Sequence, residues 1–369
     1  MVLLLPLLES IRTQWPDSTL DVVVGSNASD LLSGVEGLNR IFVCGSQNAK
    51  IQLIGYYRRF FRNLRLYKRE VMPFDYDLAL APRWGSIMTS EAIYLAYFSR
   101  AALRAGYSAS VDHGNNALDN LLTNAVAGGA HEHEVIRNVR LLERAGLTRP
   151  MPTIEQLVNQ AIPSLRNVAR QGESQLTGSL SVLSSTARPY GVVSPGATRR
   201  FNRWPAERLA SVMRELHSKY SLHFCVAGGP SDAAMCGALA ALVPECATSI
   251  AGQTSLRQLT HLLASAELFL GMDSGTAHIA GGLGIPTVIV SPFPSSCTVE
   301  HPNSPLRFRP CGPHVRVVQP ELPLPPCCPT CSVKKPHCIQ QISAEHVVHV
   351  SSELLDAVRV TKNQTTSPY

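Results

Sequence analysis

Short apolar runs alternate with amphipathic stretches along the front half of the chain. The runs at 19–26, 40–46 and 75–82 are typical of buried strands, and the stretch at 90–106 is typical of a helix. Strands that alternate with helices favour a parallel sheet with helices on both faces. The pattern therefore predicts an α/β fold for this half.

Two further helices are predicted in the front half. Over residues 131–146, Val135, Val139 and Leu142 recur at helical spacing, and Gly146 is placed to end the helix. The leucine-rich start of the chain also has helical spacing. It has no basic residue before the apolar run and no small-residue cleavage site after it, so we interpret it as a helix and not as a targeting segment.

The back half repeats strand, turn and helix more regularly. Strands are predicted at 190–197, 223–232, 267–272 and 286–292, and helices at 205–220, 255–266 and 275–284. A Ser-, Gln- and Gly-rich stretch with weak periodicity separates the halves. The predicted organisation is a first domain over 1–165, a linker over 166–188, a second domain over 189–342, and a C-terminal helix and tail over 343–369.

A polar turn, DSGTAH at 273–278, joins a buried strand to a helix. The first amides of that helix and its positive dipole end favour an anion. Gly275 leaves room for a phosphate, Ser274 and Thr276 offer hydroxyls, and His278 lies one turn into the helix. The alternative is that the turn only caps the helix and that the histidine is an ordinary surface residue.

Other strands of this half also end in small or polar turns, SPGATRR and AGGPSD. Side by side, such turns form a rim of the size of a phosphate and a ribose. The first turn and the residues after it carry a positive cluster, Arg199, Arg200 and Arg203, which suits a phosphate. A solvated turn is the alternative for these arginines.

Composition narrows the class of protein. Hydrophobic residues make up 45% of the 369 residues and charged residues 16%, which excludes a disordered chain. The formal net charge of +6 suits a partner with phosphates, and no nucleic-acid motif accompanies it. Ten cysteines in a chain of this size favour a reducing compartment over a disulfide framework.

The back half resembles the donor domain of glycosyltransferase family 9, the lipopolysaccharide core heptosyltransferases. The similarity lies in SPGATRRFNRWPAERLASV, VAGGPSDAAM, the segment from IAGQTSL to PTVIV, and CCPTCSVKKPHCIQQISAEHV. In the front half, WPDSTLDVVVG, FDYDLALAPRW and HEHEVIRNVRLLERAGL match in the same order.

The resemblance implies a GT-B fold, in which two Rossmann-like domains face a cleft. It implies an inverting, metal-independent enzyme without a cofactor, which moves a heptose or related sugar from an ADP-sugar to a lipopolysaccharide core or similar lipid-linked glycan. It also implies a bacterial, cytoplasmic protein. The turns and the resemblance together give the donor-binding residues as Ser194, Gly196, Arg199, Arg200, Asn202, Arg203, Thr254, Ser255, Asp273, Ser274, Gly275, Thr276 and His278.

Two features depart from the family pattern. Asn202 stands where family members commonly have a lysine that contacts the diphosphate. The chain starts at the helix that follows the family's first strand and base-bearing loop, so we expect a first domain without that strand and without the family's base. The catalytic residue is left unknown, with Asp112 and His113 as candidates and a plain turn as the alternative.

Two alternative functions remain open. The protein could be an inactive sugar-nucleotide-binding protein, or a transferase that uses another nucleotide sugar.

Two segments remain outside this scheme. The pattern over residues 55–71 predicts a basic amphipathic helix. Its basic side has three alternative roles: a peripheral contact with the anionic inner face of the bacterial inner membrane, a surface that steers an anionic acceptor, or a solvated face. We expect the protein to bind no metal. The alternative is a zinc site near the end of the second domain, where four residues have a suitable spacing: Cys328, Cys331, His337 and Cys338.

Overall fold

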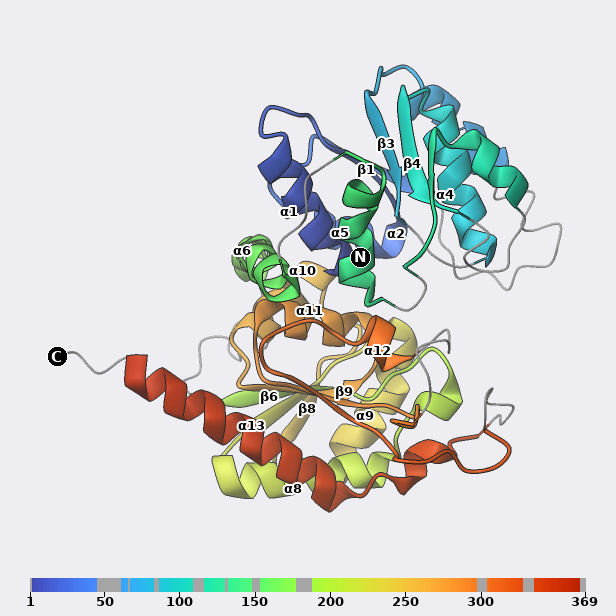
Figure 1. Ribbon diagram of the computed structural model, residues 1–369. Coiled ribbons are helices and arrows are strands. Elements are labelled where there is room, and N and C mark those ends of the chain that lie inside the picture. The colour runs from blue at the N-terminus through green and yellow to red at the C-terminus, as the bar shows by residue number, and fades with distance from the viewer. Residues whose placement is uncertain are drawn as a thin grey trace. The chain divides into compact units, whose positions relative to one another are not determined.

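The computed structural model describes residues 2–44, 61–65, 67–82, 86–108, 116–129, 132–147, 153–176, 188–296, 304–327 and 335–365. The chain divides into two compact units, one over Leu3–Leu157 and one over Val158–Tyr369 (Figure 1). Both units contain parallel strands and helices, so the predicted α/β class is confirmed.

The boundary between the units falls inside helix α6, Ile154–Glu173. Its buried residues Leu165, Val168 and Ala169 recur at helical spacing, a periodicity that the polar residues around them obscure in the sequence. Residues 166–173, which we expected in a linker, are therefore helical. Residues 174–176 follow the helix, and residues 177–187 of the expected linker lie outside the described residues.

The second unit is built on one sheet of parallel strands: β6 Tyr190–Ser194, β7 His223–Val226, β8 Ala247–Ser249, β9 Leu268–Met272, β10 Thr287–Val290 and β11 Val315–Val318. Their spatial order is β11-β10-β9-β6-β7-β8. If these six strands are numbered 1 to 6 in chain order and read from the β8 edge, the order is 3-2-1-4-5-6, which is the order of the dinucleotide-binding fold. The order reverses between β6 and β9, and open α/β sheets bind ligands beyond the carboxyl ends of the strands at such a point.

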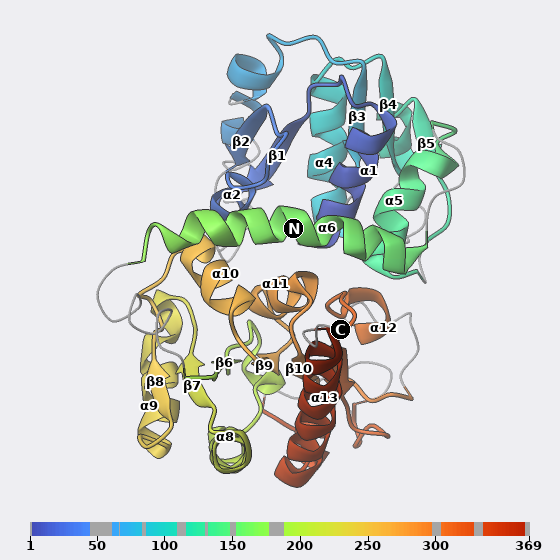
Figure 2. The same ribbon diagram turned by 90° about the vertical axis from the view of Figure 1, so that its left-hand side faces the viewer.

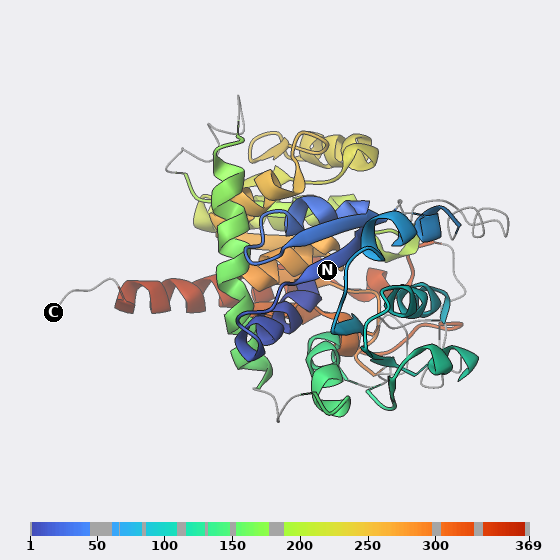
Figure 3. The same cartoon turned by 90° about the horizontal axis from the view of Figure 1, so that it is seen from above.

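Helices cover both faces of this sheet (Figures 1 and 2). One face carries α8 Ala206–Tyr220, α9 Ala233–Leu242 and α13 Ala344–Thr365, and the other carries α10 Leu256–Ala264 and α11 Gly275–Leu283. Every residue of β6, β9 and β10 is buried, as expected for strands covered on both sides. Shorter elements are η5 Arg200–Asn202, η6 Pro230–Asp232, α12 Pro305–Phe308 and η7 Cys338–Gln341. The last turns of α13 project beyond the sheet (Figure 3).

The described strands of the first unit form two parallel sheets, β1-β2 and β3-β4-β5. The strands are β1 Asp21–Gly25, β2 Arg40–Cys44, β3 Leu78–Ala81, β4 Leu103–Tyr107 and β5 Asn124–Val126. The other elements are η1 Val2–Leu4, α1 Leu5–Gln14, α2 Ser26–Leu32, the π-helix η2 Tyr67–Val71, α4 Ser86–Phe98, η4 Asn116–Leu121 and α5 Glu134–Arg144.

Two helix predictions of this unit are confirmed and one is partly wrong. The predicted apolar residues of α5 pack against α1, where Leu7 and Ile11 contact Val139 and Leu142. The helix expected over 90–106 ends at Phe98, and the chain turns at Arg100, whose φ is +61°. Residues 103–107 form β4 because they pair with both β3 and β5, a tertiary gain that outweighs their helical propensity.

The predicted basic helix is described only from residue 61 onward. Its apolar positions Tyr67 and Val71 are buried against Phe42 of β2, whereas Arg62 and Arg65 are exposed. The division into an apolar and a basic side is confirmed for these residues. None of the described helices is both long and apolar enough to cross a membrane.

Candidate functional site

The amino end of helix α11 lies at the carboxyl edge of the second sheet, directly after β9. Ser274 is its N-cap, and its Oγ accepts the amide of Ala277 at 3.3 Å. The amides of Gly275 and Thr276 are in the first turn and have no partner within the helix. A Cβ on Gly275 would meet nothing within 4 Å, so an anion has room to approach these amides.

Asp273 and His278 face one another across this first turn. His278 Nε2 lies 3.5 Å from Asp273 Oδ1, and the two side chains are 17% and 34% exposed, so a ligand can reach both. His278 Nδ1 is buried and has no hydrogen-bond partner among the described residues. The polar groups that sequence analysis assigned to this turn are therefore brought together, with the Nε2 edge of the ring beside the carboxylate.

The turn after β6 lies next to the turn after β9, because the two strands pair in parallel with Ser194 opposite Gly271. The approach is close: a Cβ at Gly271 would lie 2.6 Å from the carbonyl oxygen of Ser194. Gly196 follows two residues later and is half-buried. Ser194 and Gly196 therefore border the reversal point of the strand order, and their contact with a phosphate stays a prediction.

The three arginines of the cluster follow on the same turn and differ in their exposure and contacts. Arg199 and Arg200 are exposed, whereas Arg203 donates from Nε to the carbonyl of Ala197 at 3.1 Å and so fixes its own turn. Asn202 Oδ1 is buried without a hydrogen-bond partner in the described part of the chain. The backbone amide of buried Trp204 donates to the sulfur of Met272 at 3.4 Å, which ties the arginine turn to the end of β9.

The turns after β7 and β8 continue this edge of the sheet. Gly252 donates its amide to the carbonyl of Gly228 at 2.9 Å, which joins the two turns. Asp232, which sequence analysis did not single out, accepts the amide of Gly229 at 3.2 Å, and its carboxylate carbon lies 3.6 Å from the place of a Cβ on Gly196. The GGPSD sequence was the available signal, since aspartate in such turns bonds to nearby amides.

Thr254 and Ser255 lie at the start of α10, beyond the β8 turn. Ser255 Oγ accepts the amide of Gln258 at 3.2 Å, and the Gln258 side chain accepts the amide of Ser255 at 2.7 Å. This reciprocal pair is a capping box, so the Ser255 hydroxyl is already used to begin a helix. Thr254 is half-buried beside it.

Two groups of predicted residues are not fully placed. Asp112 and His113 lie outside the described residues, so the base stays a prediction. Cys328 and Cys331 also lie outside them, whereas His337 and Cys338 are described. A residue that sequence analysis did not include, Cys327, joins these two.

The fold and the edge of the second sheet define the class of protein. Parallel strands in this order, with a helix amino end and small, polar turns at the reversal point, are typical of a protein that binds a nucleotide or sugar nucleotide. The chain belongs to glycosyltransferase family 9 (heptosyltransferase), whose family model matches residues 75–335. The protein is therefore a glycosyltransferase.

Known proteins similar to the chain agree with this family. Lipopolysaccharide heptosyltransferase 3 of Escherichia coli is 22% identical over 292 residues, which cover 78% of each chain. The structure of E. coli ADP-heptose LPS heptosyltransferase II matches with a TM-score of 0.64 and 18% identity, over 97% of this chain and 96% of that one. E. coli heptosyltransferase WaaC with ADP matches with a TM-score of 0.68 and 15% identity, over 96% and 95%. The chain shares their fold, GT-B.

Proposed function

We propose that this protein transfers a heptose or a related sugar from an ADP-sugar to the inner core of lipopolysaccharide or a similar lipid-linked glycan, with inversion and without a catalytic metal. The single observation that carries the proposal is the amino end of α11, which lies where the strand order reverses and has open space above Gly275. Such an end binds a diphosphate without the help of a metal.

The donor residues have distinct parts in this proposal. The first amides of α11 and the exposed Arg199 and Arg200 hold the diphosphate, since both carry positive charge. Asp273 carries negative charge and accepts hydrogen bonds only, so it suits a sugar hydroxyl better than a phosphate. His278 donates from Nε2 to a phosphate oxygen once the ligand is in place.

The chemistry requires a leaving group that is stabilised as it gains charge. An acceptor hydroxyl attacks the anomeric carbon from the side opposite the diphosphate, and the bond to the ADP oxygen breaks with inversion. The helix end and the arginines stabilise the charge that develops on the diphosphate. A base accepts the proton of the hydroxyl, and Asp112 and His113 remain the candidates for it.

The acceptor is inferred from relatives and from charge. The two E. coli relatives named for lipopolysaccharide act on that glycolipid by name, and the WaaC structure holds ADP. In the first unit of this chain, Arg62, Arg65 and Arg69 are exposed beside the buried Tyr67 and Val71. A basic surface of this kind attracts a phosphorylated lipid-linked acceptor at the cytoplasmic face of the inner membrane.

Calorimetric titration with ADP and with UDP tests the donor. We expect ADP to bind at least tenfold more tightly, and Asp273→Asn to weaken an ADP-sugar more than it weakens ADP alone, because the carboxylate serves the sugar. Glu321→Gln, at an exposed site after β11, is the matched control. Tighter binding of UDP than of ADP would mean that the donor is not an ADP-sugar. Binding of ADP-heptose without release of ADP in the presence of core glycolipid would favour an inactive binding protein.

A further inference from the structure

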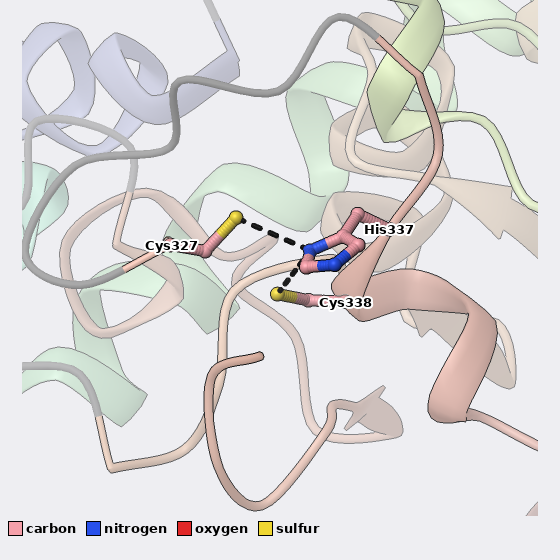
Figure 4. A group of neighbouring side chains, drawn as sticks. All are labelled: Cys327, His337 and Cys338. Atoms are coloured by element: carbon pink, nitrogen blue, oxygen red, sulfur yellow. Dashed lines mark hydrogen bonds between the residues drawn. The ribbon is translucent and has the colours of Figure 1, made fainter. Parts of the chain in front are cut away.

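A cluster of metal-ligating side chains lies away from the donor turns, between β11 and α13. Cys327, His337 and Cys338 each offer one ligand atom, and these atoms lie within 4.8 Å of one another (Figure 4). Both cysteines are buried, at 6% and 5% exposure, and the imidazole is half-buried between them. Nothing in the proposed sugar transfer uses this cluster.

The spacing of the three atoms suits a tetrahedral zinc ion. His337 Nδ1 lies 3.4 Å from Cys327 Sγ and 3.7 Å from Cys338 Sγ. With zinc bonds of about 2.3 Å to sulfur and about 2.0–2.1 Å to nitrogen, tetrahedral angles place a sulfur and a nitrogen about 3.6 Å apart. The two observed distances bracket that value.

Two sulfurs lie near the same imidazole nitrogen. Nδ1 of a neutral imidazole either donates one hydrogen or accepts one, so it serves one sulfur at a time. Here two sulfurs face it, both inside the protein. A divalent cation engages all three atoms at once, and two thiolates with a neutral imidazole balance its charge.

The chain around the cluster shows what such an ion would hold. Cys327 and His337 are ten positions apart in the sequence, and Cys338 begins η7, whose Ile339 is fully buried. The end of η7 is bonded to the residue that follows the arginine turn: Trp204 Nε1 donates to the carbonyl of Ile342 at 3.2 Å. An ion would therefore link Cys327 to the start of η7, whose other end is bonded to Trp204 beside the arginine turn.

We propose that Cys327, His337 and Cys338 bind one zinc ion and that this ion is structural. It links Cys327 to the start of η7 and takes no part in sugar transfer. Because the ion binds the folded site and not the unfolded chain, its removal lowers the stability of the second unit.

Metal content of the full-length protein tests this site directly. After expression with added zinc and dialysis, mass spectrometry of the metal should give about one zinc per chain. The double variant Cys327→Ser/Cys338→Ser should lose it, and X-ray absorption of the wild type should show sulfur at about 2.3 Å and nitrogen at about 2.0–2.1 Å. Cys311→Ser is the matched control, a half-buried cysteine of the same unit, and should keep the zinc.

A second variant covers the case in which the double variant does not fold. His337→Gln removes one ligand at a half-buried position and should weaken zinc at least tenfold in competition with a chromophoric chelator, with unchanged far-UV circular dichroism. The proposal is overturned if the wild type takes up no zinc, if the variants keep it, or if only nitrogen and oxygen surround the metal. ADP titration of each variant separates this result from the proposed function, because the donor turns contain none of these residues.

Discussion

The charged groups at the edge of the second sheet and a buried charged pair of the first unit lie in different surroundings. In the second unit the main core cluster consists of apolar side chains, and the charged groups discussed above lie at the carboxyl edge of the sheet. In the first unit a fully buried guanidinium lies between β4 and α5: Arg137 sits 3.9 Å from the ring centroid of Tyr107 and 3.6 Å from Glu134. We therefore expect loss of a charge at the edge of the second sheet to affect activity, and loss of the buried Arg137 to affect folding.

The largest expected effect is on turnover, in the second unit. His278→Ala should lower kcat/KM by about 10²–10³, the loss typical of a donor that stabilises a developing negative charge. The melting temperature should stay near that of the wild type, because the ring lies at the edge of the sheet. Steady-state release of ADP and calorimetric melting measure the two effects.

An exposed histidine of the same unit provides the control for this variant. His349 on α13 lies 3.3 Å from Glu353, and both side chains are about two-thirds exposed. His349→Ala should leave kcat/KM unchanged. If the turnover of His278→Ala stayed within about twofold of the wild type, His278 would have no part in donor binding or transfer.

The next largest effect is on folding, in the first unit. Arg137→Ala should cost about 3–5 kcal/mol, the range for removing one partner of a buried charged pair. Arg137→Met, which keeps much of the volume and leaves no positive charge, should cost less. Hydrogen exchange of the α5 amides measures the loss, and Arg140→Ala, an exposed partner of Glu132, should change it by less than about 1 kcal/mol. ADP affinity should stay unchanged in all three, and a parallel loss of ADP affinity would mean that Arg137 also supports donor binding.

The continuity of the apolar runs explains how much of the fold the sequence could predict. Strands covered on both faces are continuous apolar runs, so β6, β9 and β10 were predicted, and the polar turns after β6 and β9 were predicted with their residues. The strands β5 and β8 have only three residues each and are too short for a period to show. In β4 the polar Arg104 interrupts the run, and only pairing with two neighbours makes it a strand.

The candidate site was predictable in its turns and not in its contacts. Two turns that are about 80 residues apart in the sequence meet because β6 pairs with β9, which is a property of the strand order. Contact partners such as Ala197 for Arg203 likewise depend on the path of the turn. The capping box of Ser255 and Gln258 was readable from its Ser-x-x-Gln spacing and would have assigned that hydroxyl to the helix.

A pair of glycine variants separates packing from binding within the second unit. Gly271→Ala places a Cβ 2.6 Å from the Ser194 carbonyl and should destabilise the unit by about 1–3 kcal/mol. Gly275→Ala meets nothing within 4 Å and, as a helical residue, should keep or slightly raise stability. Its methyl group would occupy the space proposed for a phosphate, so ADP affinity should fall about tenfold. Thermal melting and calorimetric titration check both, and normal ADP affinity in Gly275→Ala would place the phosphate elsewhere.

The smallest expected effect is the pH dependence of an ion-pair network in the first unit. Burial alone would raise the pKa of Glu132, but hydrogen bonds and charges from Arg144 and Arg140 outweigh it, and the pKa is lowered. Arg144 holds the carboxylate with two hydrogen bonds, of 2.8 and 2.9 Å. A lowered pKa in the folded protein means that the stabilisation is present above the unfolded value of about 4.3 and is lost as the pH falls through the folded value.

Melting curves of the wild type and of Glu132→Gln across this range test the network. At neutral pH the wild type should be more stable by no more than about 1 kcal/mol, because water screens a pair that is partly exposed. The difference should shrink below about pH 4 as the carboxylate takes up a proton. Glu245→Gln removes the partner of Arg214 in the second unit, where both side chains are half-exposed, and should show no measurable difference at any pH. Equal pH dependence of the two variants would mean that the ion pairs of the first unit stabilise it no more than those on the surface of the second.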